Sequence, residues 1–198
     1  MKSPKIFLAS SRPIGDHCRE YLTRMEDIYT AVPRIEMADV VISVMYDQIL
    51  PERIVNTKLC YNFHPGLLPN YRGAGAYSWA ILNRDSQTGV TLHEIDKDID
   101  HGKIIAVERV PIRDTDTAET LFDQCMQVMY DMFRVWLSPI VLRSYPTYEN
   151  EGGHLYLRKH LEEQRDLTRY VRAFTFEGKP NAFYTDKSGN RHELRWDQ

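Results

Sequence analysis

The sequence predicts an α/β protein with an open, mostly parallel sheet, followed by a small α+β extension that ends in a β-hairpin. Two observations predict the sheet. Short apolar runs alternate with helix-like stretches over the first two-thirds of the chain, and polar residues follow several of these runs directly. A third observation separates the extension: after Pro139 the composition changes, and Ser144–Gly153 is rich in turn residues, as expected of a linker.

The elements of the sheet follow from the hydrophobic patterning. Runs that are apolar, β-branched or alternating predict strands. In chain order these runs are Lys5–Ser10, Met37–Tyr46, Leu59–Phe63, Val90–Ile95 and Lys103–Ile112. Three further stretches predict helices, the last with apolar residues three and four apart. They are Asp16–Ile28, Ala76–Asn83 and Thr117–Leu137. The alternation predicts a Rossmann-like sheet, but no GxGxxG follows the first strand, so a dinucleotide is not expected.

The last part of the chain predicts fewer and smaller elements. A strand at His154–Arg158 and a helix at Leu161–Val171 are expected to precede a terminal hairpin that turns at Gly189. The strands of this hairpin are AFYT and RHELRW. The sequence therefore predicts two parts, a first domain over residues 1–143 and a C-terminal extension over residues 144–198.

Composition narrows the class of partner. The 198 residues carry a formal net charge of −3, which gives no electrostatic reason to expect nucleic acid or an anionic membrane. The N-terminus shows no signal peptide, and no apolar run approaches the roughly 20 residues that span a bilayer, so a cytoplasmic location is expected. The three cysteines are widely spaced and predict neither a disulfide framework nor a zinc site.

The polar residues best suited to chemistry lie at the end of the third expected strand. Asn62 and His64 are two apart in extended chain, so their side chains point to the same side and can face one substrate atom. Pro65 and Pro69 stiffen the following loop, and Gly66 lets backbone approach a ligand closely. Alone, an Asn-x-His pair is weak evidence, because a buried histidine is more often a satisfied core residue than a catalyst.

Two further stretches make this pair informative. One is the loop Leu67–Gly73 (LLPNYRG), and the other begins with Thr88–His93 (TGVTLH) and continues to Asp100–Gly102. Together with the Asn-x-His strand end, they resemble in order and spacing the 10-formyltetrahydrofolate-dependent formyltransferase family, over about Val40–Leu137. The resemblance implies the fold of that family and an N-formyltransferase activity, with 10-formyltetrahydrofolate as the co-substrate and no metal.

In this resemblance the family's catalytic asparagine, histidine and aspartate fall on Asn62, His64 and Asp100. Attack of an amine on a formyl carbon creates a tetrahedral oxyanion, which needs donors already aimed at it. The Asn62 amide and a protonated His64 are suitable donors. Asp100 is expected to raise the proton affinity of the histidine, to fix its ring and to assist proton transfer. A solvated loop acid remains the alternative for Asp100, because Asp96 and Asp98 lie beside it.

The resemblance also implies where the substrates lie. A pterin ring is expected between an apolar loop and the loop before the catalytic aspartate. The cofactor-binding residues expected there are Met45, Tyr46, Ile49, Leu50, Asp96, Asp98 and Ile99. Without the family, Met45–Leu50 would predict only the end of a core strand. The substrate-binding residues expected around the same edge are Ser10, Arg12, Arg72, Gly73 and Tyr77. His93 and His101 are expected in structural or rim positions, not as metal ligands.

The sequence of the extension indicates which class of amine accepts the formyl group. The region Leu155–Tyr184, which contains Arg172–Phe174 followed by Gly178 and Pro180, resembles the C-terminal region of the sugar N-formyltransferases. This implies an acceptor that is a dTDP- or UDP-linked 4-amino sugar, and with it a role in lipopolysaccharide O-antigen biosynthesis. Three alternatives remain: another small amine of the glycinamide or hydroxyornithine type, a non-catalytic folate-binding module, and an α/β protein with a coincidental Asn-x-His loop.

One departure from the family pattern concerns the N-terminal part. Only about ten residues, Tyr29–Ala38, separate the first expected helix from the second expected strand, where the family usually has a further strand–helix–strand portion. The sheet is therefore expected to be smaller, and part of the usual substrate wall to be missing or replaced. A homodimer formed through the tail hairpin is a hypothesis that would compensate for this loss.

Overall fold

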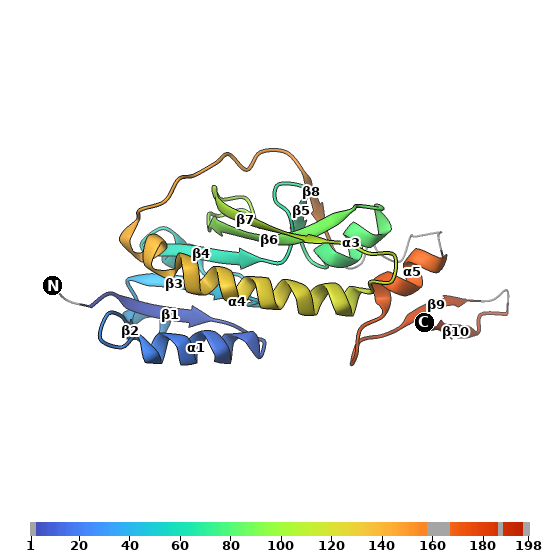
Figure 1. Cartoon of the computed structure of the whole chain (residues 1–198), viewed down its shortest axis with the longest axis horizontal. Helices are drawn as coiled ribbons and strands as arrows, with labels where there is room; N and C mark the ends of the chain where they lie inside the picture. Colours follow the sequence, from blue (N-terminus) through green and yellow to red (C-terminus); the bar gives the residue numbers. More distant parts are fainter. Residues whose placement is uncertain (1–2, 158–166, 186–187, 196–198) are drawn as a thin grey trace.

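The computed structural model describes residues 3–157, 167–185 and 188–195 of the chain. Its central sheet has six strands: β1 (Lys5–Ala9), β2 (Thr30–Ala31), β3 (Val40–Val44), β4 (Leu59–His64), β6 (Gln87–Glu94) and β7 (Ile104–Pro111). Their order in space is β2-β1-β3-β4-β6-β7 (Figure 1). The first four of these pair in parallel, whereas β6 is antiparallel to both neighbours. The predicted open, mostly parallel α/β fold is confirmed.

Each predicted strand of the sheet is present within a few residues of its expected range. The sequence did not predict β2, because two exposed edge residues leave no hydrophobic pattern. This short strand and a 3₁₀ turn at Ile35–Met37 fill the brief Tyr29–Ala38 stretch. The first helix, α1 (Ile14–Arg24), begins earlier and ends earlier than the predicted Asp16–Ile28.

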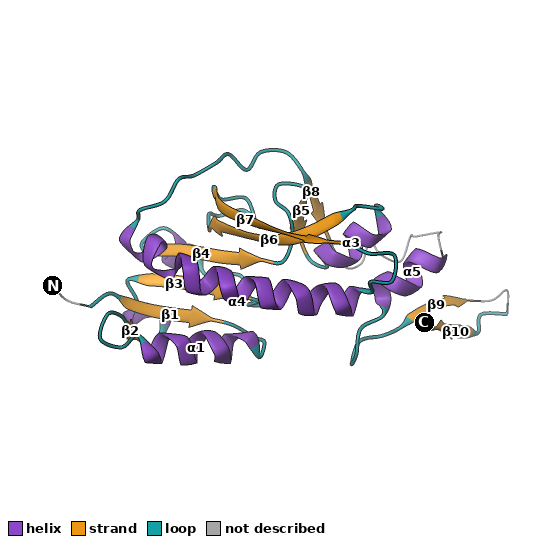
Figure 2. Ribbon diagram, viewed as in Figure 1, coloured by secondary structure: helices purple, strands orange, loops and turns teal. Residues whose placement is uncertain are grey.

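Two layers cover the faces of the sheet. On one face, α1 and the long helix α4 (Ala118–Leu142) pack side by side, and their buried side chains form one cluster with those of the strands (Figure 2). On the other face the short helix α2 (Glu52–Val55) packs through Ile54 on Val41 and Cys60. β3, at the centre, is buried along its whole length, as expected for a strand covered on both faces.

The long helix is well defined at both ends. Thr117 and Thr120 form a reciprocal capping box at its start, each hydroxyl accepting the backbone N–H of the other. Arg143, with a φ of 55°, ends the helix in the left-handed conformation common at this position. The helix extends five residues beyond the predicted end at Leu137, because Pro139 lies within it without ending it.

Beyond α4 the chain turns back over the sheet, and we call residues 144–157 the strap. Tyr148 forms an antiparallel bridge with Ile104 at the start of β7. Further on, β8 (His154–Tyr156) pairs in parallel with β5 (Tyr71–Gly73). Figure 1 shows the strap arching over the sheet from the end of α4 to β8. The expected strand His154–Arg158 is present as far as Tyr156, and Arg158 lies outside the described residues.

The tail consists of α5 (Leu167–Phe174) and a hairpin of β9 (Ala182–Thr185) and β10 (Arg191–Leu194), so the predicted hairpin is confirmed. The Ser78 hydroxyl of α3 (Ala76–Leu82) donates to the backbone oxygen of Ala173, which ties α5 to the body. α5 continues past the predicted end at Val171. The first part of that predicted helix, residues 161–166, and the expected Trp196 lie outside the described residues.

The placement of α4 predicts the effect of truncating its core side chains. Phe133 is fully buried, with its ring 5.8 Å from that of Phe63 and 6.2 Å from that of Tyr21 (centroid distances). Phe133→Ala should lower the free energy of unfolding by about 3–5 kcal/mol, because it leaves a cavity. Val135 is 68% exposed, so Val135→Ala should change it by less than about 0.5 kcal/mol. Denaturant unfolding measures both, and similar losses would contradict this packing.

Candidate active site

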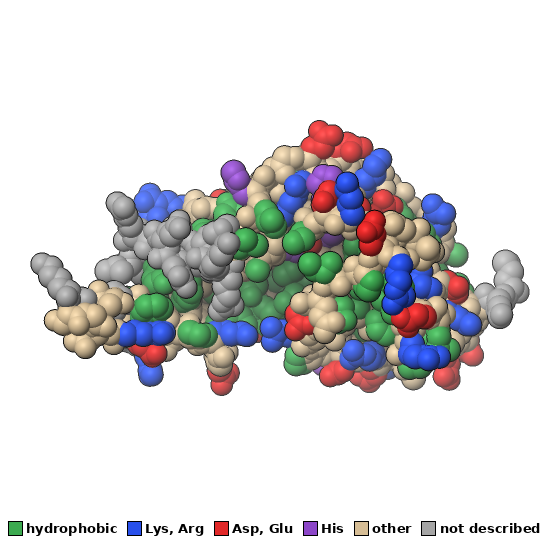
Figure 3. Space-filling model, turned by 180° about the vertical axis from the view of Figure 1, so that it is seen from behind, with side chains coloured by type: hydrophobic (Ala, Val, Ile, Leu, Met, Phe, Trp, Pro, Cys, Tyr) green, Lys and Arg blue, Asp and Glu red, His purple; other side chains and the backbone are tan. Residues whose placement is uncertain are grey.

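The loops at the carboxyl ends of the parallel strands enclose a cavity of about 660 Å³. β1, β3 and β4 run in the same direction, so the segments that follow them meet at one edge of the sheet. Apolar side chains reach the cavity from Met45–Leu50, and polar ones from β4 and from Asp96–Asp100. Figure 3 shows this side of the molecule hollowed, with hydrophobic side chains on the floor of the hollow.

Most residues predicted for the site line this cavity. They are Asn62, His64 and Asp100, the expected folate contacts Met45, Tyr46, Ile49, Leu50, Asp96, Asp98 and Ile99, and Arg12, Gly73 and Tyr77. Of the described residues predicted for the site, two lie outside the lining. The Ser10 hydroxyl donates to the backbone oxygen of Arg12 at 3.2 Å. The Arg72 guanidinium donates to the backbone oxygen of Asn150 in the strap at 2.6 Å.

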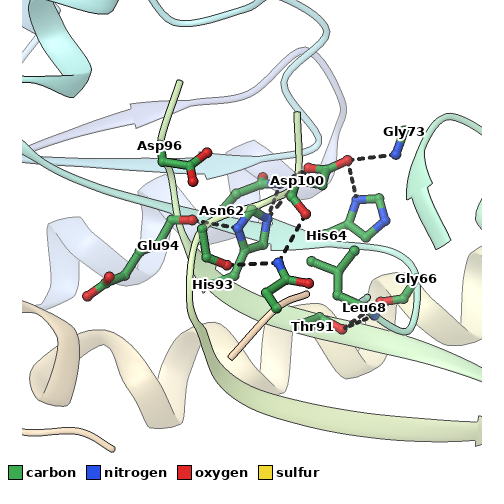
Figure 4. A network of polar contacts seen from close by, with 12 residues as sticks. Asn62, His64, Gly66, Leu68, Gly73, Thr91, His93, Glu94, Asp96 and Asp100 are labelled. Atoms are coloured by element: carbon green, nitrogen blue, oxygen red, sulfur yellow. Dashed lines mark hydrogen bonds and ion pairs between the residues drawn. The ribbon is translucent and has the colours of Figure 1, made fainter. Parts of the chain in front are cut away.

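Asn62, His64 and Asp100 meet at one wall of the cavity (Figure 4). One carboxylate oxygen of Asp100 accepts a hydrogen bond from the Asn62 amide at 3.2 Å. The other lies 3.4 Å from Nδ1 of His64 and accepts from the backbone N–H of Gly73 at 2.8 Å. Asp100 has a φ of 48°, a left-handed conformation that aspartate tolerates better than most residues. Its carboxylate thus links β4 with β5.

A fourth polar residue, His93 of β6, completes this cluster. It is 1% exposed and lies opposite Asn62 in the β4–β6 ladder. Its Nδ1 lies 2.6 Å from the backbone oxygen of Glu94, which only accepts, so Nδ1 carries the hydrogen. Nε2 of the neutral ring then accepts from the Asn62 amide at 3.1 Å. Both amide hydrogens of Asn62 therefore have partners, His93 and Asp100. His93, expected in a structural or rim position, is buried within the cluster because of the strand register, which the sequence does not give.

Burial governs the charge of His64. Its side chain is 4% exposed, and this loss of solvent lowers the pKa of the imidazole below its ordinary value, although the Asp100 carboxylate pulls in the opposite direction. Nε2 lies 2.6 Å from the backbone oxygen of Tyr71, so the hydrogen of the neutral ring is on Nε2. Nδ1 then faces Asp100 without a hydrogen and can accept one.

For the pKa of Asp100, the effect of burial is outweighed by the neighbouring groups. Burial raises the pKa of its carboxyl group, but the imidazole of His64, the contact with His93 and the backbone N–H of Gly73 outweigh it. The pKa of Asp100 therefore lies well below its usual range. The carboxylate is ionised at neutral pH, which suits it to stabilise a positive charge on His64.

The loop after His64 is held rigidly against the cluster. Thr91 of β6 is fully buried; its hydroxyl donates to the backbone oxygen of Gly66 at 2.6 Å and accepts from the N–H of Leu68 at 3.1 Å. A Cβ atom at Gly66 would lie 2.8 Å from Nε2 of His64 and 2.6 Å from the Cβ of Ala76. Glycine is therefore required for the imidazole to occupy its position.

The tail contributes a wall of the cavity that the sequence did not predict. Leu155 of the strap and Phe174, Phe176 and Lys179 of the tail line it. The ring of Phe176 stacks on that of Tyr77 of α3, with centroids 6.4 Å apart. The sequence of this region resembles the C-terminal region of the sugar N-formyltransferases, but that resemblance assigned no contacts to it. Tertiary packing decides which part of an extension reaches a distant loop.

Other features of the described residues bear on metals and membranes. Residues 3–157, 167–185 and 188–195 hold no group of three or more His, Cys, Asp or Glu side chains arranged for a metal ion. His101 lies at the exposed rim, with Nδ1 2.7 Å from the carboxylate of Asp96. The three cysteines are buried and unbridged. Within the part of the chain that the structure describes, no helix has the length and apolar character needed to cross a bilayer.

Comparison with known proteins identifies the family of the chain. The family model described as Formyl transferase matches residues 11–134, which include the whole polar cluster. A methionyl-tRNA formyltransferase from a Nitratiruptor species is 33% identical over 162 residues, covering 80% of this chain and 50% of that protein. A GDP-perosamine N-formyltransferase from Brucella melitensis is 32% identical over 158 residues, covering 73% of this chain and 60% of that protein. The chain belongs to the formyl transferase family, and it spans only about half of these curated relatives' length.

Solved structures share the fold over nearly the whole chain. Rv3404c from Mycobacterium tuberculosis matches with a TM-score of 0.85 at 23% identity, covering 98% of this chain and 97% of that chain. A sugar N-formyltransferase from Shewanella sp FDAARGOS_354 matches with a TM-score of 0.81 at 20% identity and the same coverage. The formyltransferase PseJ from Anoxybacillus kamchatkensis, in complex with UDP-4,6-dideoxy-4-formamido-L-AltNAc and tetrahydrofolate, matches with a TM-score of 0.72 at 25% identity, covering 88% and 93%.

The buried, neutral His64 predicts a pH dependence of stability. In the unfolded chain the imidazole takes up a proton near its ordinary pKa of 6.5, whereas its pKa in the folded protein is lower. The unfolded state therefore binds more protons in this window, and stability should fall as the pH is lowered through 6.5. His64→Gln should lose less stability over the same window. Urea unfolding midpoints between about pH 8 and 5 measure this; equal slopes for both proteins would show that His64 is not buried in its neutral form.

Proposed function

We propose that this chain transfers the formyl group of 10-formyltetrahydrofolate to the amine of a nucleotide-linked amino sugar. One observation carries the proposal: in a member of the formyl transferase family, Asn62, His64 and Asp100 lie together on the wall of one cavity. The cavity, at about 660 Å³, has the size of a small-molecule site.

The reaction exchanges one carbon–nitrogen bond for another. The amine nitrogen of the acceptor attacks the formyl carbon, and negative charge develops on the formyl oxygen. The bond from the formyl carbon to the folate nitrogen then breaks. The amine loses a proton, and the folate nitrogen gains one. The protein must therefore stabilise an oxyanion and move a proton across a short distance.

His64 suits the proton transfer. The sequence predicts a protonated His64, but burial favours the neutral ring, so we assign it as the group that accepts the amine proton. Protonation at Nδ1 would turn the 3.4 Å contact with Asp100 into an ion pair. With its low pKa, Asp100 is a weak base, and it assists the transfer by orienting the ring and stabilising its charge.

Asn62 is the candidate donor to the formyl oxygen. The contacts of its amide with His93 and Asp100 fix the plane of the side chain before substrate binds. Because both amide hydrogens already have acceptors, donation to the oxyanion requires one of them to be shared with the substrate. Oriented donors of this kind contribute roughly 3–4 kcal/mol to transition-state stabilisation in other acyl transfers.

One set of lining residues fits the folate. Met45, Tyr46 and Leu50 form an apolar wall of the kind that a flat heterocycle prefers. Ile49 and Ile99 also line the cavity and are 81% and 46% exposed, so a bound ring would cover apolar surface that otherwise faces water. Among proteins of this fold, PseJ carries tetrahydrofolate in its crystal structure and HypX from Aquifex aeolicus carries tetrahydrofolic acid.

Other residues of the lining fit an anionic ligand with an aromatic group. Arg12 and Lys179 line the cavity and suit a diphosphate. Tyr77 and Phe176 offer aromatic surface for a nucleotide base. GDP-perosamine N-formyltransferase and PseJ, one named for a nucleotide sugar and the other crystallised with one, support this class of acceptor.

The proposal is tested by assaying the full chain with 10-formyltetrahydrofolate and a panel of amines. The panel contains GDP-, UDP- and dTDP-linked amino sugars together with glycinamide ribonucleotide, hydroxyornithine and methionyl-tRNA. Mass spectrometry detects the formamido product. No turnover with any nucleotide sugar would exclude the proposed acceptor class. Turnover with another amine would identify the alternative, and folate binding without transfer to any amine would favour a non-catalytic binding module.

Substitution of the polar cluster tests the assigned roles. Asn62→Ala, His64→Ala and Asp100→Asn should each lower kcat at least about a hundredfold, because the first two remove groups that act on the reacting atoms and the third removes the charge that orients and stabilises His64. Affinity for a non-reactive folate, measured by calorimetry, should change little. His17→Ala, which removes an exposed histidine of α1, is the matched control. A variant that keeps wild-type kcat would remove its residue from the mechanism.

The homodimer expected from the sequence remains a proposal. The hairpin β9–β10 packs on α5, with Ala182 against Val171, and projects from the body of the molecule (Figure 1). Such a hairpin can present its outer surface to a second copy. Sedimentation at micromolar concentration should show a dimer, and a monomer under these conditions would overturn the proposal.

A further inference from the structure

Asn150 is the one residue buried in the strap as the structure describes it, over 144–157. It is 3% exposed, whereas its neighbours Glu149 and Glu151 are exposed. Before Asn150 the strap is held to β7 of the central sheet by the bridge between Tyr148 and Ile104, and after it the strap is held to β5 by the pairing of β8. A buried amide is costly unless it is hydrogen-bonded, so its partners show what this residue does.

Both hydrogens of the Asn150 amide go to the loop that carries Asp100. Nδ2 donates to the backbone oxygen of Asp100 at 3.1 Å and to that of Gly102 at 2.8 Å. Backbone oxygens only accept, so the orientation of the amide is determined. Gly102 packs so closely on the backbone of Glu94 that a Cβ atom would overlap it. The loop therefore follows one tight path, and Asn150 binds it on both sides of His101.

The backbone of Asn150 reaches the second segment that holds Asp100. Its carbonyl oxygen accepts a hydrogen bond from the Arg72 guanidinium at 2.6 Å. The next residue, Gly73, donates its N–H to the Asp100 carboxylate at 2.8 Å. Asn150 is thus hydrogen-bonded to the backbone of Asp100 and also to β5. The N–H of Gly73 in β5 in turn donates to the Asp100 carboxylate. This arrangement also accounts for the position of Arg72, which the sequence predicts as a substrate-binding residue.

We propose that Asn150 is a positioning residue for the reaction: it holds the loop of Asp100 against β5, so that the carboxylate stays beside His64. Asn150 does not line the cavity among the described residues, so it acts through Asp100 and not on the substrate. The inference rests on the proposed function, because it assigns a supporting residue to the same site. A displacement of about 1 Å at a catalytic group can lower the rate about a hundredfold, which is the reason that a brace on this loop matters.

Two substitutions remove the hydrogen bonds of the Asn150 amide in different ways. Asn150→Asp keeps the shape of the side chain but replaces the donor by an oxygen that repels both backbone oxygens. Asn150→Ala removes the group without introducing a buried charge, and it provides the test if Asn150→Asp does not fold. Glu151→Ala, one residue further along the same strap, is the matched control. For both Asn150 variants we expect kcat to fall about tenfold or more, with KM for each substrate within about twofold of wild type.

Hydrogen–deuterium exchange provides a readout that does not depend on activity. Backbone amides of residues 96–104 should exchange faster in both Asn150 variants than in wild type or Glu151→Ala, because the loop loses two hydrogen bonds. Unchanged exchange in this segment would overturn the proposal that Asn150 restrains the loop. Faster exchange with unchanged kcat would overturn its role in the reaction.

A double-mutant cycle tests whether Asn150 acts through Asp100. In an Asp100→Asn background, Asn150→Ala should lower the residual kcat by less than about twofold, because the carboxylate that it positions is already gone. A loss as large as in the wild-type background would overturn the inference. Absence of formyl transfer by the wild-type chain would count against the proposed function instead, and the exchange experiment would still decide whether the strap restrains the loop.

Discussion

The site depends on how the buried carboxylate of Asp100 is compensated. Its side chain is 13% exposed, and an ionised group in such a place costs several kcal/mol unless charges and hydrogen bonds surround it. The N–H of Gly73 and the amide of Asn62 donate to it, and the imidazoles of His64 and His93 lie 3.4 and 3.5 Å away, where a proton on either ring would add an ion pair. These groups lie on three strands, so the carboxylate is stable only when β4, β5 and β6 are all in place. The same groups keep it ionised.

The sequence, with its resemblance to a family, was sufficient for the fold class and for three residues of the cluster, Asn62, His64 and Asp100. Apolar runs such as Val40–Val44 are buried on both faces, and this burial is what makes a central strand recognisable in a sequence. Asn62 and His64 point the same way because side chains alternate along a strand. Asp100 is far from them in sequence, and only its resemblance to a family motif placed it in the same site.

Other parts of the site could not be predicted because long-range packing decides them. His93 joins the cluster through the register of β6 on β4, which a single sequence does not fix. The strap has the composition of a linker, yet Asn150 within it is buried. Arg72 has the charge expected of a substrate contact, but its guanidinium bonds to the strap. β2 is too short to leave a pattern.

The cavity takes its walls from two regions of the chain. Asn62, His64 and Asp100 come from the central sheet and its loops, whereas Phe176 and Lys179 come from the tail. On the proposed function, bond making and recognition of the nucleotide therefore involve segments that lie far apart in the sequence. Selection for a new acceptor can act on the tail while the reacting groups stay unchanged, as long as the strap that joins the two regions keeps its contacts with the sheet.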